Sequence, residues 1–204
     1  MNDDGLPKIC AHITPAYRHA LGIVVKLNVG YGLVEMVGGF ISGSQALKAD
    51  ALDFLGDGLM GFPSLLAIGM SLVCRARSAL IQGLFLAMLG LGVLATTGYR
   101  VLVSKQPEAE LMGLFGAVAL MVSLTATAVL IPHQEDDVNV RAVWLLSRND
   151  TIGTAAVLVA TGLVWWTGTA WPDLAVAVVI TGLFLQSAWS IIRDAQTDLR
   201  ASHD

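Results

Sequence analysis

The chain has 204 residues, of which 55% are hydrophobic and only 14% are charged, and its mean hydropathy is +0.68. Soluble domains carry about a quarter charged residues, so this composition excludes an ordinary water-soluble fold and indicates a polytopic membrane protein. The formal net charge of -4, without any basic stripe, excludes nucleic acid as a partner, and two cysteines are too few for a disulfide framework.

Apolar segments of membrane-spanning length follow one another along the chain, separated by short polar turns. They lie at about Leu21–Phe40, Ala46–Val73, Leu80–Val103, Leu111–Ile131, Trp144–Trp166 and Leu174–Ile192. The sequence therefore predicts an all-α fold, a bundle of six transmembrane helices over residues 18–193. We expect an N-terminal tail at residues 1–17 and a short C-terminal tail at residues 194–204.

Basic residues set the expected orientation, because short cytoplasmic loops collect Lys and Arg. An even number of spans places both tails on one side of the membrane. Most basic residues, from Lys8 to Arg200, fall on that side, and the other side holds only Lys48, Arg100 and Lys105. We therefore expect both termini in the cytoplasm, with the protein integral to the inner (plasma) membrane of a bacterium.

The first two spans are rich in glycine, at Gly30, Gly32, Gly38 and Gly39 in the first and at Gly56, Gly58, Gly61 and Gly69 in the second. Small residues let two helices approach closely within a membrane, where no hydrophobic force drives them together. The pattern predicts tight packing between these spans.

The second span carries three carboxylates, Asp50, Asp53 and Asp57, at positions i, i+3 and i+7. This spacing places all three on one face of a helix. Each ionised Asp at the middle of a bilayer costs about 2.5–3.5 kcal/mol on insertion scales. A bound cation is the simplest way to offset that cost.

The fifth span supplies a counterpart in Asn149 and Asp150, which lie within about 100° of each other around its helix. Packed against the second span, these residues would close an oxygen cage with Asp53 and Asp57 that suits a divalent metal. The alternative is that Arg148 or Lys26 pairs with one of the acids in a structural ion pair.

Other polar residues within the spans are less specific. Asn28 and Glu35 are seven residues apart and share a helix face. With Asp50, they would either line an access route or hydrogen-bond to neighbouring helices. In the N-terminal tail, Cys10 and His12 form a weak candidate for metal capture.

Signatures of ATP-driven pumps and of intramembrane hydrolases do not occur in the sequence. It has no glycine-rich nucleotide-binding loop followed by Lys and Ser, and no helical His-Glu-x-x-His pair. We therefore expect neither a bound nucleotide nor an enzymatic reaction.

The polar residues of several spans form one combined pattern. Its members are Asn28 and Glu35, the run from Ser42 to Ala51 leading into Asp53 and Asp57, the run Asn139-Val140-Arg141, Trp144-Leu145, Asp150, and Trp171-Pro172-Asp173. In order, spacing and helix placement, this pattern resembles the transmembrane domain of the cation diffusion facilitator family. The resemblance covers nearly the whole chain.

The resemblance implies a six-helix transporter of the cation-efflux type, embedded in membrane lipid and usually a homodimer. Such a transporter exports a divalent metal, such as zinc, cobalt, cadmium, iron or manganese, from the cytoplasm in exchange for protons. Carried over by position, the metal ligands are Asp53, Asp57 and Asp150.

The chain departs from the family pattern in two respects. Zinc-selective members usually have a His four residues before the Asp of the fifth span, where this chain has Leu146. We take Asn149 as the candidate replacement on geometric grounds, and the loss of the imidazole leaves manganese, cobalt or iron open beside zinc. Because the chain ends at Asp204, we also expect the family's cytoplasmic metal-binding domain to be absent.

The expected mechanism is that the metal enters from the cytoplasm, binds deprotonated carboxylates and leaves outward when protons replace it. A second interpretation is a non-transporting membrane protein that binds metal for assembly or sensing. A third is a proton-coupled carrier of another small cation.

Overall fold

The computed structural model describes residues 15–66, 72–103, 106–130 and 138–201, and these form an all-α bundle. In chain order the helices are α1 (Pro15–Ser42), α2 (Gln45–Leu66), α3 (Leu72–Val103), α4 (Ala109–Leu130), α5 (Val138–Thr167) and α6 (Trp171–Ala201). The predicted fold of six helices is confirmed. Helix α6 continues to Ala201, through much of the segment expected as a tail, whereas Cys10 and His12 lie outside the described residues.

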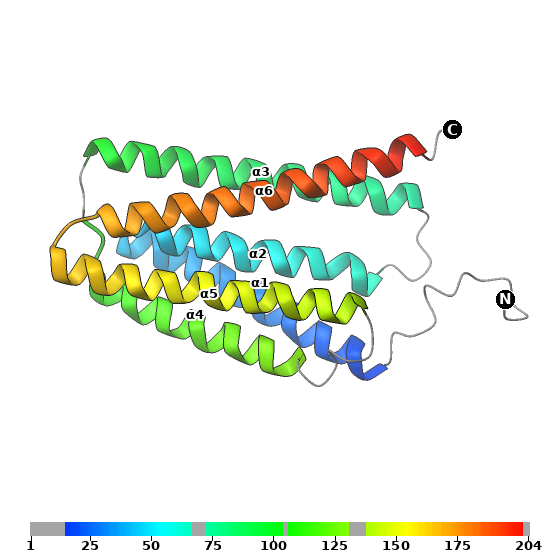
Figure 1. The fold of residues 1–204 in the computed structure, drawn as a ribbon, viewed down its shortest axis with the longest axis horizontal. Coiled ribbons are helices and arrows are strands. Elements are labelled where there is room, and N and C mark those ends of the chain that lie inside the picture. Colours follow the sequence, from blue (N-terminus) through cyan, green and yellow to red (C-terminus); the bar gives the residue numbers. More distant parts are fainter. Residues whose placement is uncertain (1–14, 67–71, 104–105, 131–137, 202–204) are drawn as a thin grey trace, which may run out of the picture.

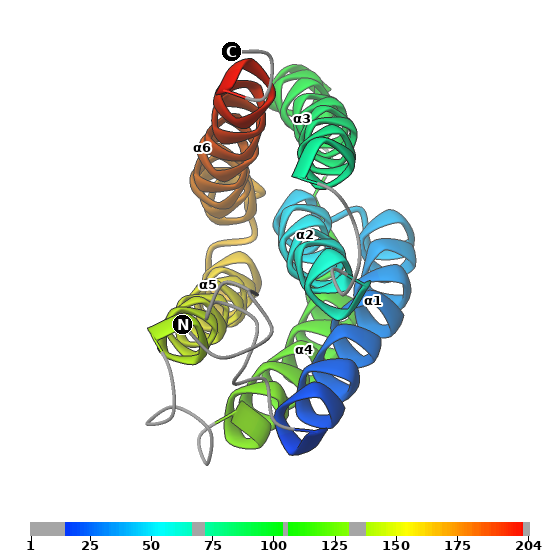
Figure 2. The same ribbon diagram turned by 90° about the vertical axis from the view of Figure 1, so that its right-hand side faces the viewer.

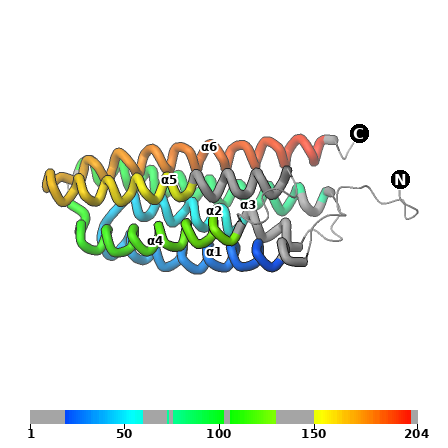
Figure 3. The backbone as a smooth tube through the Cα atoms, turned by 60° about the horizontal axis from the view of Figure 1, so that its bottom comes forward, coloured from blue at the N-terminus to red at the C-terminus, as the bar shows by residue number. Residues whose placement is uncertain are grey.

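The helices run along a common axis and pack most extensively as three pairs, α1 with α2, α3 with α6, and α4 with α5 (Figure 1). Helix α2 lies toward the middle when the bundle is viewed from one end (Figure 2), and it contacts each of the other helices. The start of α1 and the end of α6 lie at the same end of the bundle (Figure 1), and the tube in Figure 3 shows the helices running between its two ends. This agrees with an even number of crossings.

Within the described residues, four helices contain a stretch long and apolar enough to cross a membrane, namely α1, α3, α4 and α6. The described side chains of α2, residues 45–59, include Lys48, Asp50, Asp53 and Asp57. Since α2 is surrounded by the other helices, its charges face protein where lipid would penalise them.

The outer faces of the bundle are apolar. Ile81 and Leu102 of α3 are 69% and 83% exposed, and Trp189 of α6 is 67% exposed. Trp165 and Trp166, near the end of α5, are also exposed, as expected of aromatic rings at a membrane interface. A lipid environment accounts for this surface, which water would not tolerate at such extent.

Glycine permits the close packing of α1 on α2, as the sequence predicts. A Cβ atom built on Gly32 would lie 3.1 Å from the carbonyl oxygen of Ala51, and one on Gly58 would lie 3.2 Å from the amide nitrogen of Val29. Any larger residue at these positions would press on the neighbouring backbone. The close approach fixes α2, and with it the carboxylates, against α1.

The first turn of α2 is held by a carboxylate from α6. Asp173, 1% exposed, accepts hydrogen bonds from the backbone amides of Gln45 at 2.9 Å and Ala46 at 3.0 Å, and from the Ser44 hydroxyl. The Ser44 hydroxyl in turn accepts the amide hydrogen of Leu47 at 3.0 Å. These contacts satisfy amides that a helix start leaves unpaired, and they place a negative charge at the positive end of the α2 dipole.

Candidate metal centre

The three acids of α2 occupy one side of the helix, as predicted, but at different depths and with different neighbours. Asp50 is 1% exposed, whereas Asp53 and Asp57 are half-buried. Helix α2 contacts α5 along this side. The spacing of the acids therefore distributes them along the interface between two helices instead of gathering them at one point.

Asp57 and Asp150 bring the second and fifth spans together, as the sequence analysis expects. Their carboxyl groups lie next to each other across the interface between α2 and α5, and Asp53 lies within electrostatic range of both. Asp150 is half-buried. The side chains of Asn149 and Leu146 fall outside the described residues, so the proposed fourth ligand stays a prediction.

The carboxylates do not yet form a closed cage. Among the described residues, no three Asp, Glu, His or Cys side chains converge closely enough to hold one metal ion. The pair Asp57 and Asp150 supplies two anionic oxygen donors, and a third, from Asp53, stands one turn away on α2. Coordination by all three would require α2 and α5 to shift relative to each other.

No positive charge within the described part of the chain pairs with Asp50, Asp53, Asp57 or Asp150. Lys26 is exposed on α1 and does not form the structural ion pair considered as an alternative. The Arg148 side chain lies outside the described residues. A group of acids inside a bundle without a basic partner is the arrangement that a bound cation would stabilise.

A second acidic pair lies on the same side of α2, between α1 and α5. Glu35 is fully buried, and among the described residues no hydroxyl, amide or basic group donates a hydrogen bond to either of its carboxylate oxygens. Its carboxyl group lies beside that of Asp50. Asp50 Oδ1 accepts a hydrogen bond from the Thr154 hydroxyl at 3.2 Å, while no hydroxyl, amide or basic group in the described part of the chain donates to Asp50 Oδ2. Asn28 is also buried, at 6% exposure.

Thr154 is a residue that sequence reasoning missed. Its hydroxyl lies 3.5 Å from that of Ser123 on α4 and donates to Asp50 on α2, so it links three helices. A lone Thr in an apolar run has no distinguishing spacing. The one available signal was its position four residues after Asp150, on the same face of α5.

Tyr31 fixes the wall beside the acidic pair. Its hydroxyl donates a hydrogen bond to the carbonyl oxygen of Phe115 on α4. Its ring meets Phe54 of α2 edge-on, with centroids 5.4 Å apart and planes at 70°. These contacts tie α1, α2 and α4 together one turn from Glu35.

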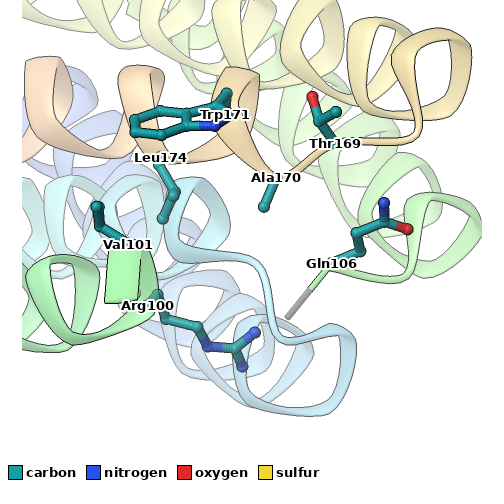
Figure 4. A pocket seen from close by; sticks show the side chains of 7 residues that line it. All are labelled: Arg100, Val101, Gln106, Thr169, Ala170, Trp171 and Leu174. Carbon is teal, nitrogen blue, oxygen red and sulfur yellow. The ribbon is translucent and has the colours of Figure 1, made fainter. Parts of the chain in front are cut away.

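A shallow hollow of about 200 Å³ lies at the end of the bundle where α6 begins (Figure 4). It is lined by Arg100, Val101, Gln106, Thr169, Ala170, Trp171 and Leu174. None of the carboxylates described above lines it. It is therefore separate from the candidate metal centre.

Comparison with known proteins identifies related sequences. The cation efflux transmembrane domain family matches residues 75–199, which run from the first turn of α3 almost to the end of α6 and include Asp150. The acids of α2 lie outside this match.

Several curated bacterial proteins are similar over most of the chain. The zinc transporter ZitB of Escherichia coli is 27% identical over 186 residues, which cover 85% of this chain and 59% of that protein. The metal cation efflux system protein CzcD of Cupriavidus metallidurans is 26% identical, with 87% of this chain and 60% of the relative covered. A cadmium, cobalt and zinc/H(+)-K(+) antiporter of Bacillus velezensis is 24% identical, with 90% and 63% covered.

The chain spans about three fifths of the length of these relatives, from 59% of ZitB to 63% of the antiporter. The family match, in contrast, covers more than half of the chain itself. The helical bundle, its apolar outer surface and this match agree with one another. The chain belongs to the cation efflux family of integral membrane proteins, also called cation diffusion facilitators.

Proposed function

We propose that this protein exports a divalent transition-metal cation from the cytoplasm in exchange for protons. Asp53, Asp57 and Asp150, with Asn149, would bind the ion. The observation that carries the proposal is the Asp57–Asp150 pair, two carboxylates side by side between α2 and α5 with no basic partner among the described residues. Relatives named as zinc transporters and as metal efflux proteins support it.

The donor set favours ions that accept oxygen ligands. Asp53, Asp57 and Asp150 offer carboxylate oxygens, and the position where imidazole is usual in zinc-selective relatives holds Leu146. Carboxylates bind manganese, cobalt and iron as well as zinc. We therefore propose a broader metal range than a site with an imidazole ligand would have.

Proton exchange follows from the same carboxylates. In a bundle interior, neighbouring carboxylates cannot all stay charged without a counter-charge, so each departing metal ion must be replaced. Protons are the replacement that leaves the same oxygens neutral. The antiporter name of one relative supports this exchange.

We further propose that the bundle, residues 18–193, forms a homodimer in the inner membrane of a bacterium, with both termini in the cytoplasm. The common end of α1 and α6 and the distribution of basic residues support this orientation. Cysteine labelling from either side of intact cells, at an added C-terminal cysteine, would test it.

The decisive experiment measures metal flux in sealed proteoliposomes under an imposed pH gradient. Wild-type protein should move zinc, manganese, cobalt or cadmium only when protons can move in the opposite direction. Asp57→Asn should abolish the flux, and Asp198→Asn, at an exposed position of α6, is the matched control that should retain it. Absence of flux for every metal, with folded and inserted protein, would favour the assembly or sensing interpretation.

A further inference from the structure

Glu35 and Asp50 form an acidic pair that is separate from Asp57 and Asp150. Asp50 precedes Asp57 by two turns of α2, about 10 Å along the helix axis. Both members lie close to the connection between α1 and α2, because Glu35 is in the last two turns of α1 and Asp50 is in the second turn of α2. The pair therefore lies between the candidate metal centre and that end of the bundle.

The pair is buried and has few hydrogen-bond donors around it among the described residues. Apart from the contact between the two carboxyl groups, both oxygens of Glu35 and one oxygen of Asp50 are buried without a hydrogen-bond partner in the part of the chain that the structure describes. Leaving a buried carboxylate unpaired costs several kcal/mol or more, so native proteins rarely do so without a ligand or a functional reason. A proton shared by the two carboxyl groups offsets part of this cost, and a bound cation would offset more of it.

The carboxyl groups of Glu35 and Asp50 hydrogen-bond to each other, which requires a proton on one of them, and no basic side chain among the described residues supplies a counter-charge. Lys48, the only basic residue of α2, places its ammonium 4.4 Å from the centre of the Phe40 ring. The Tyr31 hydroxyl is engaged with the carbonyl oxygen of Phe115. The Thr154 hydroxyl reaches only Oδ1 of Asp50. When the proton between the two carboxyl groups leaves, a cation can take its place.

We propose that Glu35 and Asp50, with the Thr154 hydroxyl, bind a divalent metal cation at a second step of the transport path. All donors are oxygens, which suits a hard or borderline ion such as manganese or cobalt. The inference rests on the proposed function, since it assigns the part of the path toward the connection between α1 and α2.

Asp53 lies between the two acidic pairs along α2 and connects them. It lies three residues after Asp50 and four before Asp57, so a carboxylate occurs at every turn of α2 between the two pairs. An ion can then exchange ligands from turn to turn instead of leaving one deep site in a single step. Several sites of moderate affinity allow release more readily than one tight site.

Metal binding at equilibrium tests the proposal directly. Purified full-length protein in detergent, dialysed against manganese, should bind two ions per chain. Glu35→Gln should bind one, and Asp57→Asn should also bind one, because each removes a different site. Glu110→Gln, at an exposed position in the first turn of α4, is the matched control and should still bind two.

Two ions retained by Glu35→Gln would overturn the proposal, as would a wild-type protein that binds one ion whether or not Glu35 is replaced. If Glu35 and Asp50 hold only a proton, the wild-type protein would bind one ion, and so would Glu35→Gln. Asp50→Asn is a second variant with the same expected loss, should Glu35→Gln fold poorly by size-exclusion chromatography.

Flux measurements separate this proposal from the proposed function. If Glu35→Gln lowers manganese flux at least tenfold while one ion stays bound, both proposals stand. If wild-type protein binds two ions yet moves none, the export function fails but the second site stands. If wild-type flux is intact and Glu35→Gln changes neither flux nor binding, only the second site fails.

Discussion

The carboxylate of Asp173, in the first turn of α6, accepts the backbone amide hydrogen of Gln45, the first residue of α2, at 2.9 Å. The same carboxylate also takes the amide of Ala46 and the hydroxyl of Ser44. Two helices whose contact residues are 128 positions apart in sequence are thus joined at their starts by one buried side chain. The helix that carries the acids is anchored at this point.

Asp173→Asn should destabilise the bundle. Both carboxylate oxygens of Asp173 accept hydrogen bonds, and the NH2 group of Asn would replace one of them with a donor that faces the donors at the start of α2. Losing a buried charge-assisted hydrogen bond costs about 1–3 kcal/mol. Thermal unfolding of purified protein in detergent should show a lower midpoint. Asp198→Asn, on the exposed face of α6, is the control. Equal midpoints for the two variants would show that the anchor is dispensable.

Gly32→Ala should also lower the unfolding midpoint, because the added Cβ would lie 3.1 Å from the carbonyl oxygen of Ala51 and press α1 away from α2. We expect a loss of about 1–3 kcal/mol, the range for overpacking. Gly30→Ala provides the control on the same helix, since a Cβ there meets nothing within 4 Å. The same thermal measurement compares the two variants, and an equal effect of both would contradict close packing as the reason.

Asp57→Asn and Asp150→Asn should each weaken manganese binding at the metal centre by more than about tenfold, equivalent to 1.4 kcal/mol. Because the two carboxyl groups are neighbours, the double variant should lose less than the sum of the single losses. Titration calorimetry on the four proteins of the cycle measures this coupling. Strict additivity would indicate that the two acids do not share an ion.

Metal affinity should fall as pH falls, because protons and metal compete for the same carboxylates. Manganese binding should therefore release protons, and Asp57→Asn should release fewer. Calorimetric titrations in buffers with different ionisation enthalpies count the protons. A count of zero for wild-type protein would contradict exchange at these oxygens.

Leu146→His should shift metal preference toward zinc. Residue 146 is one helical turn before Asp150 on α5, so an imidazole there would approach the same site. Imidazole nitrogen binds zinc better than manganese. Competition between the two metals in the flux assay measures the shift, with Leu146→Gln as the control. An unchanged ratio would show that this position does not face the ion.

Composition and local spacing predicted the six helices and singled out Asp53, Asp57 and Asp150 as candidate metal ligands. Both signals can be read from short segments, because they depend only on apolar length and helical period. Sequence reasoning also grouped Asp50 with Asn28 and Glu35, as residues that line an access route or hydrogen-bond to neighbouring helices. In the structure Asp50 lies beside Glu35 of α1, and it also accepts a hydrogen bond from Thr154 of α5, which sequence reasoning did not single out. The hydrogen bond from Gln45 to Asp173 was also missed, because a pairing between distant helices leaves no periodic pattern in one sequence.

The anchored start of α2 also limits how that helix can move. If the bonds from Asp173 persist during transport, α2 cannot slide along its axis and must swing about its first turn. Asp57 is twelve residues beyond Gln45, a lever arm of about 18 Å, so a swing of about 5° carries its backbone by about 1.5 Å. Asp50, near the pivot, travels less than half as far, so the same swing opens or closes the Asp57 site while leaving the Asp50 site almost in place.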